Sequence, residues 1–166
     1  MKSVFLHPVI LLRNITITLV CCLGLSACGL FQTSTTHNPT PVGGQKVVNT
    51  AYSQMGKHYR PGGASPQKGF DCSGLVWWAY TVNGYKIPRI TSDQARTGVP
   101  VPKNLMRTGD IVVFRTGEGP QSLHTGLYAG GNSFIHSPRS GGKVRMESMD
   151  IPYWRKNLVA VRRVVR

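Results

Sequence analysis

Apolar residues with a helical period occupy two stretches of the chain. In residues 45–56 they fall on one face of a helix, and Gly56 is placed to end it. That face consists of Val47, Val48, Ala51, Tyr52 and Met55. In residues 71–84 they recur at i, i+3, i+4 and i+7, and further apolar residues widen the stripe. The two patterns predict two helices, the second beginning at Asp71 or Cys72.

The pattern changes to short β-rich segments after Pro100. Five such segments are separated by Gly, Pro and Asn, at residues 110–115, 123–129, 133–137, 143–147 and 159–165. Before them, Thr91 and Gln94 have the spacing of a capping box, which predicts a short third helix. Helices followed by antiparallel strands predict an α+β domain, with N-terminal helices packed on a central sheet of about five to six strands.

Residues 1–27 have the pattern of an export signal. Lys2 and Arg13 supply positive charge, and residues 15–25 form an apolar run shorter than a membrane-spanning helix. The stretch Leu25-Ser26-Ala27-Cys28 resembles a bacterial lipobox. This resemblance implies cleavage before Cys28 and attachment of fatty acyl chains, such as palmitate, to that cysteine. An ordinary cleaved signal peptide is the alternative.

The resemblance to a lipobox also implies a location. A protein acylated at Cys28 would be held on a membrane of the bacterial cell envelope. Gly29 stands where an aspartate would favour the inner membrane, so we expect the outer membrane, on the side that faces the periplasm. Residues 28–44 are polar and rich in Thr, Pro and Gly, which predicts a flexible tether. Residues 45–166 remain as a single domain.

The charge of the chain constrains its partners. Lys and Arg number 20 against 6 Asp and Glu, a formal net charge of +14, which becomes +12 once Lys2 and Arg13 leave with the signal. A basic domain can bind nucleic acid. An exported one instead meets cell-wall peptides and anionic lipid head groups, so we expect no nucleic-acid partner. A solvated basic face without a specific ligand is equally compatible with this charge.

Signal cleavage would leave one free thiol. Cys21 and Cys22 depart with the signal and Cys28 is acylated, so Cys72 alone remains. An exported protein tends to pair its cysteines, and a lone thiol there indicates a chemical role. At a helix start, the macrodipole and unpaired N–H groups stabilise a thiolate and can also receive an oxyanion. Gly74 either leaves room for a substrate backbone beside the sulfur or serves close packing.

Two histidines on one predicted hairpin supply a base. If the turn centres on Gly130, His124 and His136 face each other across the strands, and a shift of the centre by one residue makes them diagonal neighbours. One ring would accept the thiol proton while the other fixes its tautomer. Gly126, on the same face, would keep the approach open. One Cys and two His are also plausible zinc ligands. No Cys-x-x-Cys or His-Glu-x-x-His motif accompanies them, and we expect neither a metal nor another cofactor.

Taken together, the motifs resemble the NlpC family of murein peptidases, which are papain-like cysteine enzymes. The resemblance covers residues 46–166. It rests on Asp71-Cys72-Ser73-Gly74-Leu75, Gly109-Asp110, His124-Thr125-Gly126-Leu127-Tyr128 and Phe134-Ile135-His136-Ser137, while Pro152-Tyr153-Trp154 and Val161-Arg162-Arg163-Val164 resemble lipoprotein members. It implies a papain-like fold. Thr125, where valine is usual, and Pro61, where an aromatic is common, depart from the family pattern.

The resemblance implies a role for the three residues of the constellation. Cys72 would be the nucleophile, His124 the general base and His136 the residue that orients the base. Such an enzyme would be an endopeptidase of peptidoglycan that cuts stem or cross-link peptides. The sequence leaves open whether the bond is the one between D-Glu and the diamino acid or the one between D-Ala and the diamino acid.

Three further residues match family positions around the nucleophile. Tyr59 matches a tyrosine that assists the oxyanion, or else is an aromatic packed under its loop. Asp71 and Ser73 match positions that bind polar groups of the substrate, although Asp71 could equally be only a helix cap. Two other functions stay open: a murein-binding lipoprotein whose constellation is vestigial, and an amidase or acyltransferase on the same fold.

Overall fold

The computed structural model of the chain describes residues 42–119, 122–139 and 142–166. The predicted signal peptide, Cys28 and residues 29–41 of the predicted tether lie outside the described residues. Within the described ranges, no helix has both the length and the apolar character that crossing a membrane requires.

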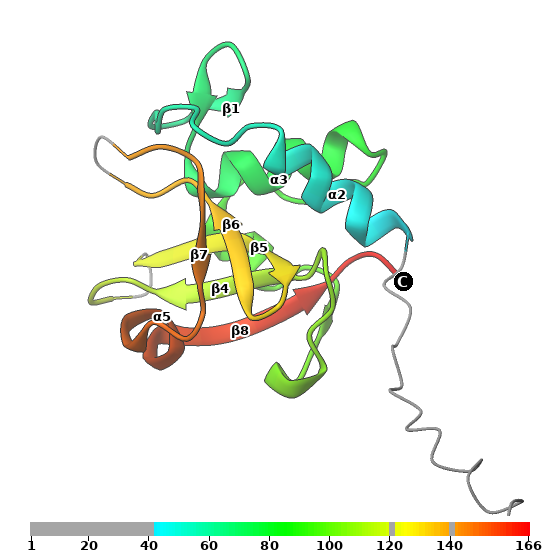
Figure 1. Ribbon diagram of the computed structural model, residues 1–166, viewed down its shortest axis with the longest axis vertical. Helices are drawn as coiled ribbons and strands as arrows, with labels where there is room; N and C mark the ends of the chain where they lie inside the picture. Colours follow the sequence, from blue (N-terminus) through cyan, green and yellow to red (C-terminus); the bar gives the residue numbers. More distant parts are fainter. Residues whose placement is uncertain (1–41, 120–121, 140–141) are drawn as a thin grey trace, which may run out of the picture. The chain divides into compact units, whose positions relative to one another are not determined.

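The two long helices come before the central strands, while a short helix lies between the last two strands. The helices are α2 (Val42–Tyr52), α3 (Cys72–Val82), α4 (Thr91–Gln94) and α5 (Pro152–Asn157), with a 3₁₀ turn at Lys103–Leu105. The strands are β1 (Ala64–Ser65), β2 (Gly69–Phe70), β3 (Val99–Pro100), β4 (Ile111–Arg115), β5 (Leu123–Gly130), β6 (Ser133–His136), β7 (Arg145–Ser148) and β8 (Leu158–Arg163). The first two pair with each other, and the other six form an antiparallel sheet in the order β3-β8-β4-β5-β6-β7 (Figure 1). The predicted α+β class is confirmed.

The central sheet carries an apolar cluster on each face. Along β4, Ile111 and Val113 belong to the cluster that includes residues of α2 and α3, while Val112 and Phe114 belong to the cluster that includes Trp154 of α5. This alternation follows from the two-residue period of a strand. Because both faces are covered, β4 is an uninterrupted apolar run in the sheet interior (Figure 1).

Helix α2 differs from its prediction at both ends. It begins at Val42, three residues before the expected start, and ends at Tyr52. Two residues of the predicted apolar face are exposed, Tyr52 at 57% and Met55 at 39%. The buried face instead begins at Gly44, where an added Cβ would lie 2.2 Å from the carbonyl oxygen of Thr108. Close backbone contact at a glycine therefore fixes this end of the helix, and an apolar pattern does not show such a contact.

Candidate active site

Cys72 is the first residue of α3, at the position that the sequence predicts. Asp71 is the N-cap in an extended conformation, and its Oδ1 accepts a hydrogen bond of 2.6 Å from the backbone N–H of Gly74. Cys72 is a partly exposed free thiol. It lines a cavity of about 620 Å³ together with Tyr59 and His124. The nucleophile, the base and the tyrosine of the sequence hypothesis are thus brought to one cavity.

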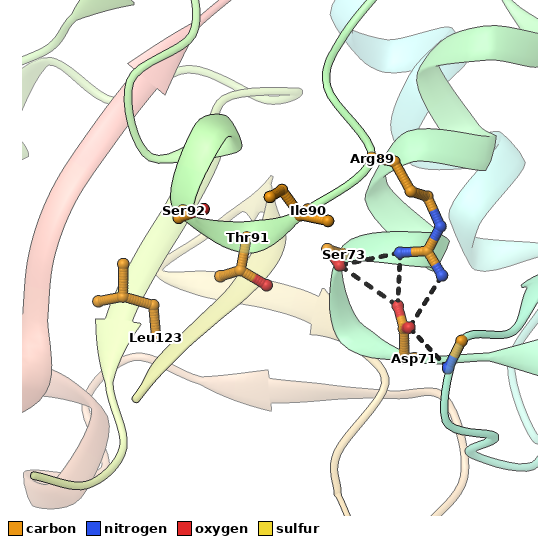
Figure 2. A pocket seen from close by; sticks show the side chains of 8 residues that line it. Asp71, Ser73, Arg89, Ile90, Thr91, Ser92 and Leu123 are labelled. Atoms are coloured by element: carbon orange, nitrogen blue, oxygen red, sulfur yellow. Dashed lines mark hydrogen bonds and ion pairs between the residues drawn. The ribbon is translucent and has the colours of Figure 1, made fainter. Parts of the chain in front are cut away.

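The carboxylate of Asp71 is fully engaged within the protein. Besides capping α3, it receives two hydrogen bonds from Arg89, of 2.8 Å to Oδ2 and 3.0 Å to Oδ1, and one of 3.0 Å from the backbone N–H of Gly62. Ser73 Oγ accepts a bond of 3.0 Å from the same guanidinium. Figure 2 shows this cluster on one wall of a second cavity, of about 550 Å³, with Leu123 on the other wall.

These contacts bear on the roles that were expected of Asp71 and Ser73. Asp71 holds the helix start to the loop at Gly62, which favours the capping interpretation. Ser73 is buried, and contact of either residue with substrate stays a prediction. Arg89 was not predicted, because nothing in the residues around it distinguishes this arginine from a solvated surface cation.

Gly74 serves close packing of α3 against the preceding loop. A Cβ at this position would lie 2.0 Å from the carbonyl oxygen of Gly63 and 2.8 Å from Asp71 Oδ1. Neither atom can withdraw cheaply, since one belongs to the backbone and the other caps the helix. Of the two interpretations left open by the sequence, the geometry supports packing.

His124 and His136 contact each other directly on adjacent strands. Their Nε2 and Nδ1 atoms are 2.7 Å apart, within hydrogen-bond distance. Of the two registers that the sequence left open, the one in which they face each other is not observed. Tyr128 pairs with Phe134, and continuing this register places His136 opposite Gly126 and diagonal to His124. The diagonal arrangement, which follows from moving the turn by one residue, is the one observed.

Gly126 makes room for the ring that crosses to His124. A Cβ there would lie 2.8 Å from the carbonyl oxygen of Ile135 and 3.2 Å from the Cβ of His136. Any larger residue would push β6 away from β5. The glycine therefore permits the contact between the histidines, whereas the sequence hypothesis had it open the approach for a substrate.

Both imidazoles are kept neutral by their surroundings. Burial, with a smaller effect of Arg139, lowers the pKa of His124 to about 4. Burial likewise lowers the pKa of His136, and the neighbouring His124 and Arg145 act in the same direction. At neutral pH, His124 therefore has a lone pair available to accept a proton.

Gln94 ties the helix of the cysteine to the strand of the base, and it was not predicted in this role. Its amide nitrogen donates to the carbonyl oxygens of Ser73, at 2.9 Å, and Pro88, at 3.0 Å, and its Oε1 accepts a bond of 3.0 Å from the Thr125 hydroxyl. The predicted capping box at Thr91 is wrong, because α4 has no side-chain cap and the amide is used elsewhere. Thr125 thus supplies a hydroxyl that valine at this position would lack.

Aromatic rings cover the histidine pair. The ring of Trp154 lies 5.7 Å from that of His124 and 5.2 Å from that of His136, centroid to centroid. Tyr59 is half-buried and lines the cavity, as expected, and help to an oxyanion stays a prediction. Within the described part of the chain, no cluster of three or more His, Cys, Asp or Glu has the arrangement of a metal site.

Known proteins resemble this chain in sequence. The model of the NlpC/P60 family matches residues 56–163. The murein DD-endopeptidase MepH of Escherichia coli K12 is 40% identical over 122 residues, 72% of this chain and 45% of the relative. The gamma-D-glutamyl-L-lysine dipeptidyl-peptidase of Bacillus subtilis 168 is 39% identical over 129 residues, 74% of this chain and 43% of the relative. The chain thus spans less than half the length of these two relatives.

A solved structure has the same fold. The crystal structure of an NlpC/P60 family protein from Bacillus cereus ATCC 10987 superposes with a TM-score of 0.70 at 33% identity, over 77% of this chain and 42% of that one. The papain-like fold that the sequence resemblance implied is therefore confirmed.

Proposed function

Since the chain belongs to the NlpC/P60 family, we propose that it is a cysteine peptidase that hydrolyses peptide bonds of peptidoglycan. One observation carries the proposal: a thiol at a helix start and a histidine held by a second histidine line the same cavity. The two curated relatives support the substrate class, because their names place their activities on murein and on a γ-D-glutamyl peptide. Those names also differ in the bond cut, so both bonds remain candidates.

The catalytic steps follow from which ring nitrogen is free. Nε2 of His124 contacts His136, which leaves Nδ1 to take the proton of Cys72. The thiolate attacks the peptide carbonyl. The oxyanion is received by N–H groups at the start of α3 other than that of Gly74, which already donates to Asp71, and Tyr59 assists. The imidazolium of His124 then protonates the leaving amine, and an acyl-enzyme forms. A water molecule, deprotonated by His124, releases the acid and restores the thiol.

The lipobox-like segment indicates where in the cell envelope this domain would act. Acylation at Cys28 would hold it on the periplasmic side of the outer membrane, within reach of the polymer. That segment lies outside the described residues, and the proposed lipid anchor rests on the sequence alone.

A digest of purified peptidoglycan tests the proposed activity. The full chain in detergent is incubated with the polymer and with isolated muropeptides, beside its Cys72→Ala variant, and mass spectrometry identifies the products. We expect new peptide fragments from the parent only, because the methyl side chain of the variant is not a nucleophile. The masses of the fragments name the bond.

Other outcomes of this digest point to the other functions. Loss of the stem peptide from the glycan would indicate an amidase. If neither protein releases fragments and both bind the polymer equally, the proposal is wrong and the chain is a murein-binding module.

A further inference from the structure

The second ring nitrogen of His136 lacks a hydrogen bond. The side chain of His136 is fully buried, and its Nδ1 faces His124 at 2.7 Å. Among the described residues, nothing lies within hydrogen-bond geometry of its Nε2. Buried ring nitrogens are normally paired, because leaving one unpaired is costly. The atom therefore needs a nearby acceptor or donor.

Glu147 on β7 is placed to supply an acceptor. Its Oε2 lies 3.5 Å from Nε2 of His136. The carboxylate is held from two other sides, since Arg145 Nε donates to Oε1 at 2.6 Å and the indole N–H of Trp154 donates to Oε2. Its side chain is 17% exposed. Glu147 is thus a fixed, partly buried carboxylate that faces the free nitrogen of the orienting histidine.

The position of one proton on His136 decides whether His124 can act as a base. With the proton on Nε2, the Nδ1 of His136 accepts from Nε2–H of His124, and Nδ1 of His124 is left unprotonated. With the proton on Nδ1, the direction of the bond reverses. A neutral His124 would then carry its own proton on Nδ1 and could not accept one from Cys72.

We propose that Glu147 is a positioning residue that keeps the proton of His136 on Nε2 and so leaves Nδ1 of His124 free to act as the base. The inference rests on the proposed function. At 3.5 Å the contact is longer than a hydrogen bond. We expect the contact between His136 and Glu147 to shorten when His124 gains a proton. The positive charge on His124 polarises the ring of His136, and this makes the Nε2–H of His136 a stronger donor to Glu147. Such contacts are often long before substrate binds.

The surrounding charges favour a neutral donor over an ion pair. Burial, His124 and Arg145 lower the pKa of His136, so its ring stays uncharged. Arg139 acts on His124 in the same sense, and Cys72 lines the cavity beside it. Arg145 also offsets the charge of the carboxylate. Glu147 therefore orients a proton and does not remove it.

Nuclear magnetic resonance of ¹⁵N-histidine in the full chain in detergent tests this assignment directly. The ring-nitrogen shifts of His136 are assigned by their loss in His136→Asn. We expect an Nε2–H tautomer in the parent and in Glu147→Gln, whose amide oxygen still accepts. In Glu147→Leu we expect Nδ1–H to become populated, because the acceptor is gone. Asp150→Asn removes a carboxylate that bonds Asn132 instead, and should change nothing.

Muropeptide kinetics with the same variants separate positioning from stability. We expect Glu147→Leu to lower kcat roughly 10- to 100-fold with KM unchanged, by analogy with the effect of removing the partners that fix the tautomer of metal-bound histidines. Glu147→Gln should recover most of kcat even though, like the leucine variant, it loses the ion pair with Arg145 and some thermal stability.

Two results would overturn the inference. One is an Nδ1–H tautomer of His136 in the parent, and the other is an unchanged tautomer and kcat in Glu147→Leu. A parent that cleaves no muropeptide would instead count against the proposed function, while the tautomer measurement would still decide the role of Glu147.

Discussion

Two features of its surroundings lower the pKa of His124 and so keep its ring neutral. Burial is the larger, and the exposed Arg139, which lines the same cavity, adds a positive charge nearby. The proposed mechanism requires a neutral His124 ring for the first proton transfer and an imidazolium for the second. The positive charge of Arg139 therefore favours the neutral ring of the resting state and disfavours the imidazolium of the intermediate.

Replacing Arg139 should raise the pKa of His124. In Arg139→Ala the repulsion between the two cations is gone, whereas burial remains, so the pKa should rise above about 4 and stay below its ordinary 6.5. Titration of the ring signals of His124 by NMR, from about pH 3 to 8, measures the shift. Arg155→Ala, an exposed cation of α5, is the control and should leave the value unchanged. An equal or lower pKa in Arg139→Ala would contradict the assignment.

Sequence motifs predicted the residues proposed to carry the chemistry better than those that hold them in place. Cys72 and His124 could be found because a helix start and a hairpin have local signatures. Arg89 and Glu147 have none, and Gln94 has only the spacing of a capping box that does not form, because each of the three contacts a partner in another part of the fold. Their polar side chains are indistinguishable in sequence from solvated ones until the fold brings the partners together.

Helix α3 holds Cys72, the proposed nucleophile, in place because contacts on two sides fix its first turn. Arg89 and the N–H of Gly62 hold the N-cap Asp71, and Gly74 lets the helix contact the carbonyl of Gly63 without a side chain between them. The direction of the Cys72 side chain thus depends on backbone contact at one glycine.

Gly74→Ala should therefore destabilise the protein despite the better helix propensity of alanine. The propensity gain is at most about 1 kcal/mol, whereas a methyl group 2.0 Å from a carbonyl oxygen forces the backbone apart, at roughly 3 kcal/mol or more. Urea unfolding measures the free energy, and kcat on muropeptides should fall with it. Thr81→Ala, an exposed alanine substitution in the same helix, should stay within about 0.5 kcal/mol. Equal stability of the two variants would show that the loop yields easily.

Periodicity predicted the long elements and missed the short ones. The span of α3 and the positions of strands β4 to β8 along the chain follow from the apolar spacing within each segment. The two-residue strands β1, β2 and β3 are too short to show a period. The first turn of α2 was missed because it packs through Gly44, and the capping box failed because tertiary contacts claim the amide of Gln94.

Charge across the domain is unbalanced even after its ion pairs are counted. In the described ranges, four carboxylates pair with arginines, namely those of Asp71, Asp93, Asp110 and Glu147. Lys and Arg outnumber Asp and Glu by 20 to 6 in the chain, so cations far exceed the carboxylates available to pair with them. Because of this excess, further protonation in acid adds to repulsion within the fold.

Stability should therefore fall in mild acid, with the buried histidines as the main cause. The unfolded chain takes up a proton at each histidine below about pH 6.5, whereas folded His124 does so only near 4, and folded His136 lower still. Between these values the unfolded state binds more protons. Stability is thus complete above about 6.5 and is lost as the pH falls, by roughly 3 kcal/mol for His124 alone.

Urea unfolding at about pH 7.5, 6 and 5 measures this loss. In a variant with His124→Asn and His136→Asn, asparagine cannot titrate, so the free energy of unfolding should vary much less over the same range. His58→Asn, which replaces an exposed histidine, should retain the slope of the parent. If the double variant loses stability in acid as steeply as the parent does, the two buried rings are not the source of the acid sensitivity. The source would then be the general repulsion among the excess cations.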